Sequence, residues 1–286
     1  MGKNSAINYC MNPLAYIAGC SIAALFCSGI LNERADAASS PFANPPPSYL
    51  LQVNGRTYRD KNPNSRHAPA SLTKIMTALV VIEKCRPDEV VTVSRSAARE
   101  TGSRIGLRRG ERLTVRDLLA ATLIASANDA ARALADHAGG SQEAFVALMN
   151  ARARSLQLQN TRFSNACGHD NRGLYSSAHD LAILAERALY SPLFADLVAT
   201  RSMRIATLKG DRSFYLRNKN RLIGRYPGAR GVKTGTTPNA GQCLVAIAKR
   251  DDKMVLLVLM HARHRWQTAP AMLDAAFAAS STAVGK

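Results

Sequence analysis

The sequence predicts an α+β fold in which the two chain ends complete an antiparallel sheet and the middle of the chain forms a helical lobe. Two observations support this. Short runs of β-branched and apolar residues, separated by turn residues, lie near residues 49–58 and beyond residue 200, whereas apolar residues between 72 and 190 recur at helical spacing. The 286 residues are 47% hydrophobic, enough for a substantial core in one large domain or two small ones.

The strands are predicted from turn residues that separate paired runs. Asn54-Gly55 is a strong signal for a two-residue hairpin turn. Lys209-Gly210-Asp211 and Asp251-Asp252 separate two further pairs of runs in the same way. The predicted strands are therefore Tyr49–Val53 with Arg56–Tyr58, Met203–Leu208 with Ser213–Arg217, and Gln242–Lys249 with Lys253–His261.

The helices are predicted from apolar spacing and from residues that begin or end helices. Pro87 should end the first helix, Gly139-Gly140 should follow the second helical stretch, and Ser141 and Ser177 can act as N-caps. The predicted helices are Leu72–Lys84, one or two helices within Thr114–His137, one from Ser141 to about Leu156, one from Ser177 to Tyr190, and a last one at Arg265–Ala279.

Residues 1–37 are predicted to be a signal peptide. The segment 13–31 is apolar, and Ala35-Asp36-Ala37 fits a cleavage site. An uncleaved membrane anchor is the alternative; a lipoprotein box at residues 17–20 is disfavoured because few apolar residues precede it. We expect a Pro-rich disordered segment at 38–47, a folded domain at 48–279 and a short tail at 280–286.

The formal net charge of +18 indicates a basic surface. Such a surface can attract nucleic acid, anionic lipid or an anionic cell wall, or can be solvated without any dedicated partner. No nucleic-acid-binding motif is present, and an exported chain would not meet chromosomal DNA. We therefore expect no nucleic-acid partner.

Cysteines and histidines predict neither a disulfide framework nor a metal site. Cys85, Cys167 and Cys243 follow the leader, can form at most one bridge and are typical of small buried side chains. The histidines show no metal-ligand spacing apart from the weak pair His261-x-x-His264. No metal and no cofactor is predicted.

Three ordered motifs carry the functional prediction: Ser71-Leu72-Thr73-Lys74, then Ser126-Ala127-Asn128, then Lys233-Thr234-Gly235. Each alone is a weak signal, because such short patterns arise by chance. Together they are similar to the motif set of penicillin-binding proteins and serine β-lactamases. Residues around the motifs, and from about 48 to 275 overall, resemble the low-molecular-mass D-alanyl-D-alanine carboxypeptidases.

The resemblance implies a β-lactamase and transpeptidase-like catalytic domain at 48–279. It implies a serine-type carboxypeptidase that removes the terminal D-alanine from peptidoglycan pentapeptide stems through an acyl-serine intermediate. Peptidoglycan peptide stems would be its substrates and β-lactam antibiotics its covalent inhibitors. With the signal peptide removed, the protein is expected to be exported to the periplasm.

Ser71 and Lys74 are the predicted nucleophile and base. A serine hydroxyl is a weak nucleophile until a base accepts its proton, and residues three apart share one face of a helix. Burial and a second nearby cation would disfavour the charged form of Lys74. Without the other motifs, a capping serine and a surface lysine would be the simpler interpretation.

The second motif offers a hydroxyl and a carboxamide. Ser126 could relay a proton to the leaving amine, and Asn128 could hold both Lys74 and the substrate amide. The alternative is that Ser126 or Asn128 is simply a helix N-cap.

The third motif is expected on a strand edge that faces the nucleophile. Lys233 and Thr234 suit the terminal carboxylate of a substrate, and Gly235 would let the substrate backbone approach closely. The resemblance implies that the backbone N–H groups of Ser71 and Thr236 form the oxyanion hole. It also suggests Arg263 as a basic residue near the site.

Two features depart from the family pattern. Many relatives add a small β domain and a membrane-anchoring helix after the catalytic domain. Few residues follow Gly235 here, so we expect neither addition and no stable membrane anchor. In addition, His169 stands where an apolar residue is common, which leaves the detail of that loop open.

Three other functions are considered. A class A β-lactamase needs a Glu in an E-x-x-x-N pattern between the second and third motifs. Only Glu143 and Glu186 lie there, and Ala147 and Tyr190 follow them at that spacing, so efficient β-lactam turnover is not expected. A D,D-endopeptidase would use the same residues and stays open. A non-catalytic wall-binding protein would not need a nucleophile and a base.

Overall fold

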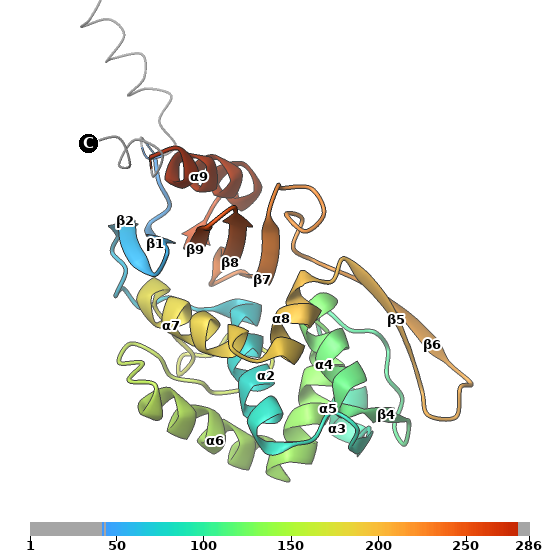
Figure 1. Ribbon diagram of the computed structural model, residues 1–286. Helices are drawn as coiled ribbons and strands as arrows, with labels where there is room; N and C mark the ends of the chain where they lie inside the picture. The colour runs from blue at the N-terminus through green and yellow to red at the C-terminus, as the bar shows by residue number, and fades with distance from the viewer. Residues whose placement is uncertain (1–41, 43, 280–286) are drawn as a thin grey trace, which may run out of the picture. The chain divides into compact units, whose positions relative to one another are not determined.

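The computed structural model describes residues 42 and 44–279. The expected signal peptide and C-terminal tail lie outside these residues. Within them, the main sheet has the strand order β2-β1-β9-β8-β7, and every neighbouring pair is antiparallel (Figure 1). The strands are β1 (Ser48–Val53), β2 (Arg56–Lys61), β7 (Ala229–Thr237), β8 (Gly241–Arg250) and β9 (Lys253–Ala262). The first strand of the chain therefore pairs with the last, as predicted.

The hairpin of β1 and β2 forms at the predicted turn. Asn54 and Gly55 adopt φ angles of 48° and 76°, the left-handed conformation that a two-residue hairpin turn requires. Strand β1 is mostly buried, whereas β2 is exposed along its whole length and carries charged residues. A charged edge strand of this kind discourages pairing with another chain.

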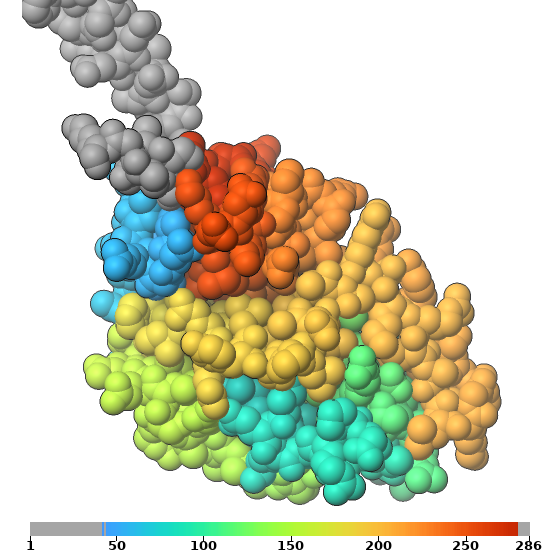
Figure 2. Space-filling model, viewed as in Figure 1, coloured from blue at the N-terminus to red at the C-terminus, as the bar shows by residue number. Residues whose placement is uncertain are grey.

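Helices cover both faces of the sheet. Helix α9 (Arg265–Ala279) packs on β9, β8 and β1, and α7 (Ala178–Leu189) packs on β9 and β1 from the side of the helical lobe (Figure 1). The lobe contains α2 (Thr73–Lys84), α4 (Val115–Ile124), α5 (Asn128–Gly139), α6 (Gln142–Ser155) and α8 (Pro192–Ala199). Figure 2 shows the yellow segment with α7 and α8 running between the strands and the rest of the lobe.

The predicted helix caps are confirmed. The hydroxyl of Ser141 accepts a hydrogen bond from the N–H of Ala144, and that of Ser177 accepts one from Asp180, at 3.1 and 3.2 Å. Each bond satisfies one backbone donor that the first turn of a helix leaves unpaired. The hairpin β5 (Ser202–Ala206) and β6 (Ser213–Arg217) also forms where predicted.

Other short elements were not predicted. They are helix α8, the small helix α3 (Arg95–Ala98), and the pair β3 (Val90–Thr92) and β4 (Arg112–Thr114). The stretch 114–137 forms two helices, α4 and α5, with a break at residues 125–127. Among the described residues, no helix is both long enough and apolar enough to span a membrane.

Phe145 should be a major contributor to stability. Its side chain is fully buried in α6, and its Cβ would lie 2.7 Å from a Cβ built on Gly139, so the two helices pack closely there. We expect Phe145→Ala to lower the free energy of unfolding by about 3–5 kcal/mol, because the substitution leaves a cavity. Equilibrium urea unfolding measures the change.

The matched control is Tyr190→Ala, since Tyr190 is 79% exposed. Its effect should stay within about 0.5 kcal/mol. Equal losses in the two variants would contradict the assignment of Phe145 to the core.

Candidate active site

The three motifs meet where the helical lobe contacts strand β7. Ser71 lies in a 3₁₀ turn, Ala70–Leu72, that leads directly into α2. Gly235 on β7 lies against this turn, because a Cβ built on it would be 2.8 Å from the carbonyl oxygen of Pro69 and 3.0 Å from the nitrogen of Ser71. Only glycine allows the strand to approach the turn so closely. The predicted strand edge therefore faces the predicted nucleophile.

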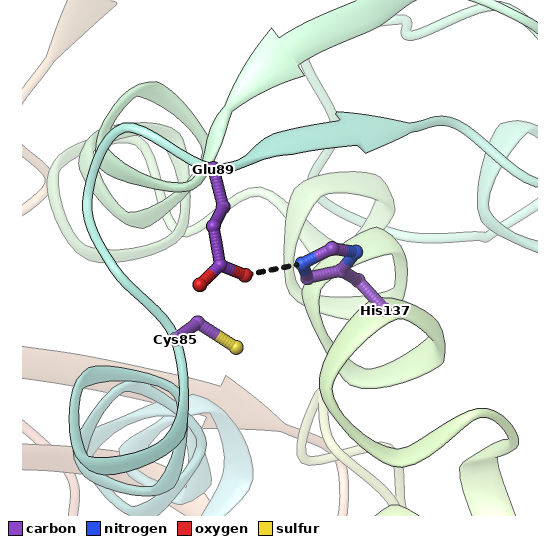
Figure 3. A group of neighbouring side chains, drawn as sticks. All are labelled: Cys85, Glu89 and His137. Atoms are coloured by element: carbon purple, nitrogen blue, oxygen red, sulfur yellow. Dashed lines mark hydrogen bonds and ion pairs between the residues drawn. The ribbon is translucent and has the colours of Figure 1, made fainter.

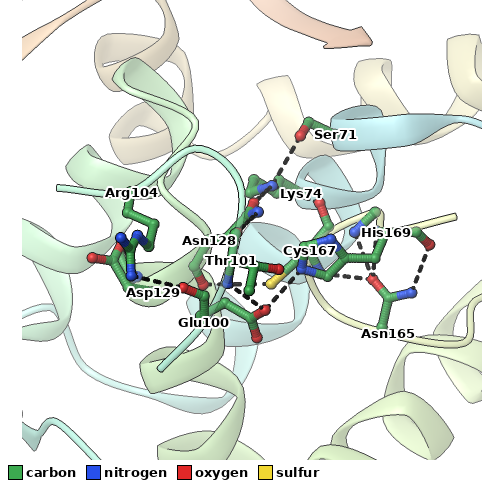
Figure 4. Close-up of polar contacts among 12 residues, drawn as sticks. Ser71, Lys74, Glu100, Thr101, Arg104, Asn128, Asp129, Asn165, Cys167 and His169 are labelled. Carbon is green, nitrogen blue, oxygen red and sulfur yellow. Dashed lines mark hydrogen bonds and ion pairs between the residues drawn. The ribbon is translucent and has the colours of Figure 1, made fainter. Parts of the chain in front are cut away.

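Lys74 is fully buried and has three oxygen partners (Figure 4). Its Nζ lies 3.0 Å from Ser71 Oγ, 2.6 Å from Asn128 Oδ1 and 2.5 Å from the carbonyl oxygen of Cys167. Burial lowers the pKa of Lys74 from its ordinary 10.5 to about 8, because the charged amine loses solvation. A sizeable fraction of Lys74 is therefore neutral near pH 8, within hydrogen-bonding distance of the Ser71 hydroxyl.

Lys233 is the second buried amine. Its Nζ donates to Ser126 Oγ at 2.8 Å and to the carbonyl oxygen of Thr234 at 3.0 Å. The pKa of Lys233 is lowered well below its ordinary value, first by burial and then by the charge of Lys74. Each of the two buried lysines thus contacts a different serine hydroxyl, Lys74 that of Ser71 and Lys233 that of Ser126, and the charge of Lys74 disfavours a charge on Lys233.

Ser126 is held in the break between α4 and α5. Its φ angle of 61° is unusual for a non-glycine residue, and it directs the hydroxyl toward Lys233. The N-cap of α5 is Ala127, which makes no side-chain capping bond, and Asn128 is the first helical residue. The N-cap interpretation of Ser126 and Asn128 is therefore wrong.

A tight loop presents the Cys167 carbonyl to Lys74. The Oδ1 atom of Asn165 accepts the backbone N–H groups of residues 167–169 at 3.1, 2.6 and 3.0 Å. Gly168 has φ +90°, and a Cβ built on it would lie 1.9 Å from the carbonyl oxygen of Ala70, so a side chain cannot be accommodated. This contact of a backbone carbonyl with Lys74 was not predicted from the sequence.

His169 links that loop to the segment that follows α3. Its Nε2 lies 2.8 Å from Glu100 Oε1, and the neighbouring carbonyl of Thr101 accepts a 2.6 Å bond from Asn128 Nδ2 (Figure 4). The Asn128 carboxamide is thereby fixed with its oxygen toward Lys74. The unusual histidine therefore has a polar partner on the segment that positions Asn128.

Arg265, and not Arg263, is the basic residue at the site. Its Nη1 donates to the carbonyl of Gly235 at 2.6 Å, to Thr236 Oγ1 at 2.9 Å and to the carbonyl of Cys243 at 3.0 Å. Arg263 is exposed, two residues earlier. The guanidinium of Arg265 fixes the end of β7. The sequence pointed to Arg265 only as the first residue of the last predicted helix.

Fold and site together define a protein of the β-lactamase and transpeptidase-like class. The chain belongs to the peptidase S11 family, described as D-alanyl-D-alanine carboxypeptidase, whose family model matches residues 50–264. The predicted resemblance is confirmed.

Curated relatives and solved structures support the same family. The chain is 41% identical over 236 residues to D-alanyl-D-alanine carboxypeptidase DacF of Bacillus subtilis, which covers 80% of this chain and 60% of that protein. It is 35% identical over 246 residues to DacD of Escherichia coli, which covers 79% and 62%. The chain thus spans about 60% of the length of these relatives.

Among solved structures, the DD-transpeptidase of a Streptomyces strain matches with a TM-score of 0.77 at 31% identity, over 82% of this chain and 97% of that one. D-alanyl-D-alanine carboxypeptidase DacD of Francisella tularensis matches with a TM-score of 0.74 at 28% identity, over 80% of this chain and 69% of that one. These matches confirm the predicted fold class.

The lowered pKa of Lys74 predicts a pH dependence of stability. The unfolded chain holds the Lys74 proton up to about pH 10.5, whereas the folded protein releases it near 8, so the unfolded state binds more protons between these values. The contribution of Lys74 to stability should therefore rise with pH across this window, by on the order of 3 kcal/mol.

Urea unfolding of the wild type and of Lys74→Met at several pH values from 7 to about 10.5 measures this contribution as the difference between the two proteins. The free energy of unfolding of the wild type should increase relative to that of Lys74→Met as pH rises. A difference that does not vary with pH would mean that Lys74 keeps an ordinary pKa.

Proposed function

We propose that this protein is a serine-type D-Ala-D-Ala carboxypeptidase that removes the terminal D-alanine from peptidoglycan pentapeptide stems. The observation that carries the proposal is the 3.0 Å contact between the Ser71 hydroxyl and the buried, low-pKa amine of Lys74. Membership of the peptidase S11 family supports this choice of substrate.

In the first step, neutral Lys74 accepts the proton of Ser71, and Oγ attacks the carbonyl carbon of the penultimate D-alanine. The backbone N–H groups of Ser71 and Thr236 stabilise the oxyanion that forms. Ser126, hydrogen-bonded to Lys233, relays to the departing amine the proton that Lys74 accepted, so that D-alanine leaves, Lys74 is neutral again and an acyl-serine remains. Water then hydrolyses this ester, and Lys74 and Ser126 assist the attack.

The terminal carboxylate of the substrate binds beside Lys233 and Thr234. In the free protein, burial and the Lys74 charge make a cation at Lys233 unfavourable. A bound carboxylate offsets this cost, because an opposite charge at short distance favours the protonated amine. The site therefore selects peptides with a free C-terminus, and Arg265 supports the same strand edge through Thr236.

We further propose that the protein works after export, with residues 1–37 removed, on peptide stems in the periplasm. The A-x-A pattern at residues 35–37 supports this location. β-Lactams would acylate Ser71 in place of the peptide.

Covalent chemistry at Ser71 is the first test. A fluorescent penicillin should label the wild type, and Ser71→Ala should abolish the labelling because the acylated oxygen is missing. Labelling is read on a denaturing gel, with Ser202→Ala as a control since Ser202 is exposed on β5. Undiminished labelling of a folded Ser71→Ala protein would falsify the nucleophile assignment.

Product analysis separates the carboxypeptidase from its alternatives. With a defined pentapeptide stem, we expect free D-alanine in many turnovers, and after mixing with penicillin we expect a persistent adduct in the intact mass spectrum. The adduct persists because the tethered leaving group blocks water and neither Glu143 nor Glu186 has the spacing of a deacylating base.

Three other results would each point elsewhere. Rapid loss of the β-lactam without an adduct and without D-alanine release would indicate a β-lactamase. Cleavage of a crosslinked dimer without release of terminal D-alanine would indicate an endopeptidase. Neither acylation nor turnover would leave a non-catalytic binding protein.

A further inference from the structure

A second group of reactive side chains lies at the far ends of two helices that carry the active site. Cys85 directly follows α2, Glu89 precedes β3, and His137 lies in the last turn of α5 (Figure 3). The thiol, one carboxylate oxygen and one imidazole nitrogen all lie within 4.8 Å of one another. Nothing in the proposed peptidase chemistry uses these three residues.

The group is open to solvent and partly pre-organised. His137 Nε2 and Glu89 Oε2 are 3.1 Å apart, and their side chains are 28% and 29% exposed. The other carboxylate oxygen of Glu89 accepts the backbone N–H of Arg86 at 2.9 Å, which fixes the carboxylate. The guanidinium of Arg86 pairs with Asp88 at 3.5 Å, and both side chains are exposed.

We propose that Cys85, Glu89 and His137 bind a Zn²⁺ ion as three of its four ligands, with water as the fourth. Thiolate, imidazole and carboxylate are the donor types that zinc takes in proteins. Around a tetrahedral zinc such donors lie roughly 3.3–3.6 Å apart, so side-chain shifts of about 1 Å close the site. On binding, Cys85 releases its thiol proton to solvent as the Zn–S bond forms, and neutral His137 coordinates through Nε2.

An ion pair alone does not explain the group. A histidine in the last turn of a helix interacts favourably with the helix dipole, and Glu89 can pair with it. Cys85 takes no part in that pair, yet its sulfur completes the three-donor geometry. The position of the Cys85 thiol therefore distinguishes a metal site from a simple Glu89–His137 ion pair.

A similar set, Glu100, Cys167 and His169, lies beneath the active site. There the thiol is buried and donates to the carbonyl of Asn128 at 3.4 Å. These residues hold the loop that positions Lys74, so they already have a structural role, and they serve as the internal comparison for the zinc proposal.

The ion would act on stability rather than on the reaction. Helices α2 and α5 begin next to the site, where Lys74 and Asn128 are hydrogen-bonded, and both end at the proposed zinc ligands. Each helix has 12 residues and so spans roughly 18 Å. Zinc would therefore cross-link the opposite ends of the pair that Lys74 and Asn128 join at the site.

Cobalt titration of the reduced, metal-free protein tests the proposal. We expect one equivalent of Co²⁺ to bind with a thiolate-to-cobalt charge-transfer band and the visible bands of tetrahedral cobalt, both lost when Zn²⁺ displaces it. Zn²⁺ should also raise the Tm, because it binds only the folded chain. Cys85→Ser should lose the charge-transfer band, and His137→Gln should weaken binding by more than about tenfold.

Cys167→Ser and His264→Gln are the matched controls and should leave the band and the affinity unchanged. A band that survives Cys85→Ser, a band that disappears with Cys167→Ser, or no band at all in the wild type would each overturn the proposal. A second measurement needs no variant: Zn²⁺ should slow alkylation of Cys85 by iodoacetamide, followed by peptide mass spectrometry. An unchanged rate of alkylation would contradict zinc binding at Cys85.

Discussion

The site depends on the removal of one amine from water. Lys74 is completely buried, and the three oxygens of Ser71, Asn128 and Cys167 replace its solvent shell. Full solvation would keep it protonated, and burial without partners would destabilise the fold severely. Oxygen acceptors on three separate segments offset the cost of burying the Lys74 amine, and its pKa nevertheless stays low. The arrangement of α2, α5 and the 165–169 loop around that amine follows from this requirement.

Lys233 adds a second constraint of the same kind. A buried amine near another buried amine is unfavourable for stability, and here Ser126 lies hydrogen-bonded to one of them in a rare backbone conformation. The proposed function gives a reason for this costly arrangement. In the function we propose, a substrate carboxylate would supply the opposite charge beside Lys233, so substrate binding would offset the cost of burying a charged amine there.

The sequence was most informative where the chemistry is local. Residues close in the chain set the Ser71–Lys74 contact at the start of α2, the hairpin turn at Asn54-Gly55 and the serine caps of α6 and α7, and all were predicted. The Cys167 carbonyl was missed because a backbone atom has no motif, and its position depends on the Asn165 loop. Arg265 was missed in favour of Arg263 because which arginine faces β7 depends on where α9 begins. The Cys85–Glu89–His137 group was missed because its members come from separate elements without a regular spacing.

The pairing of β1 with β9 also bears on how the chain folds. Tyr49 on β1 lies opposite Leu259 on β9, so these two neighbouring strands are separated in the sequence by nearly the whole domain. Contacts of such long sequence separation slow folding, because the chain must close a large loop before the pairing stabilises it. Strand β1 is synthesised well before its partner β9. The complete central sheet therefore cannot form until synthesis has passed residue 262, where β9 ends.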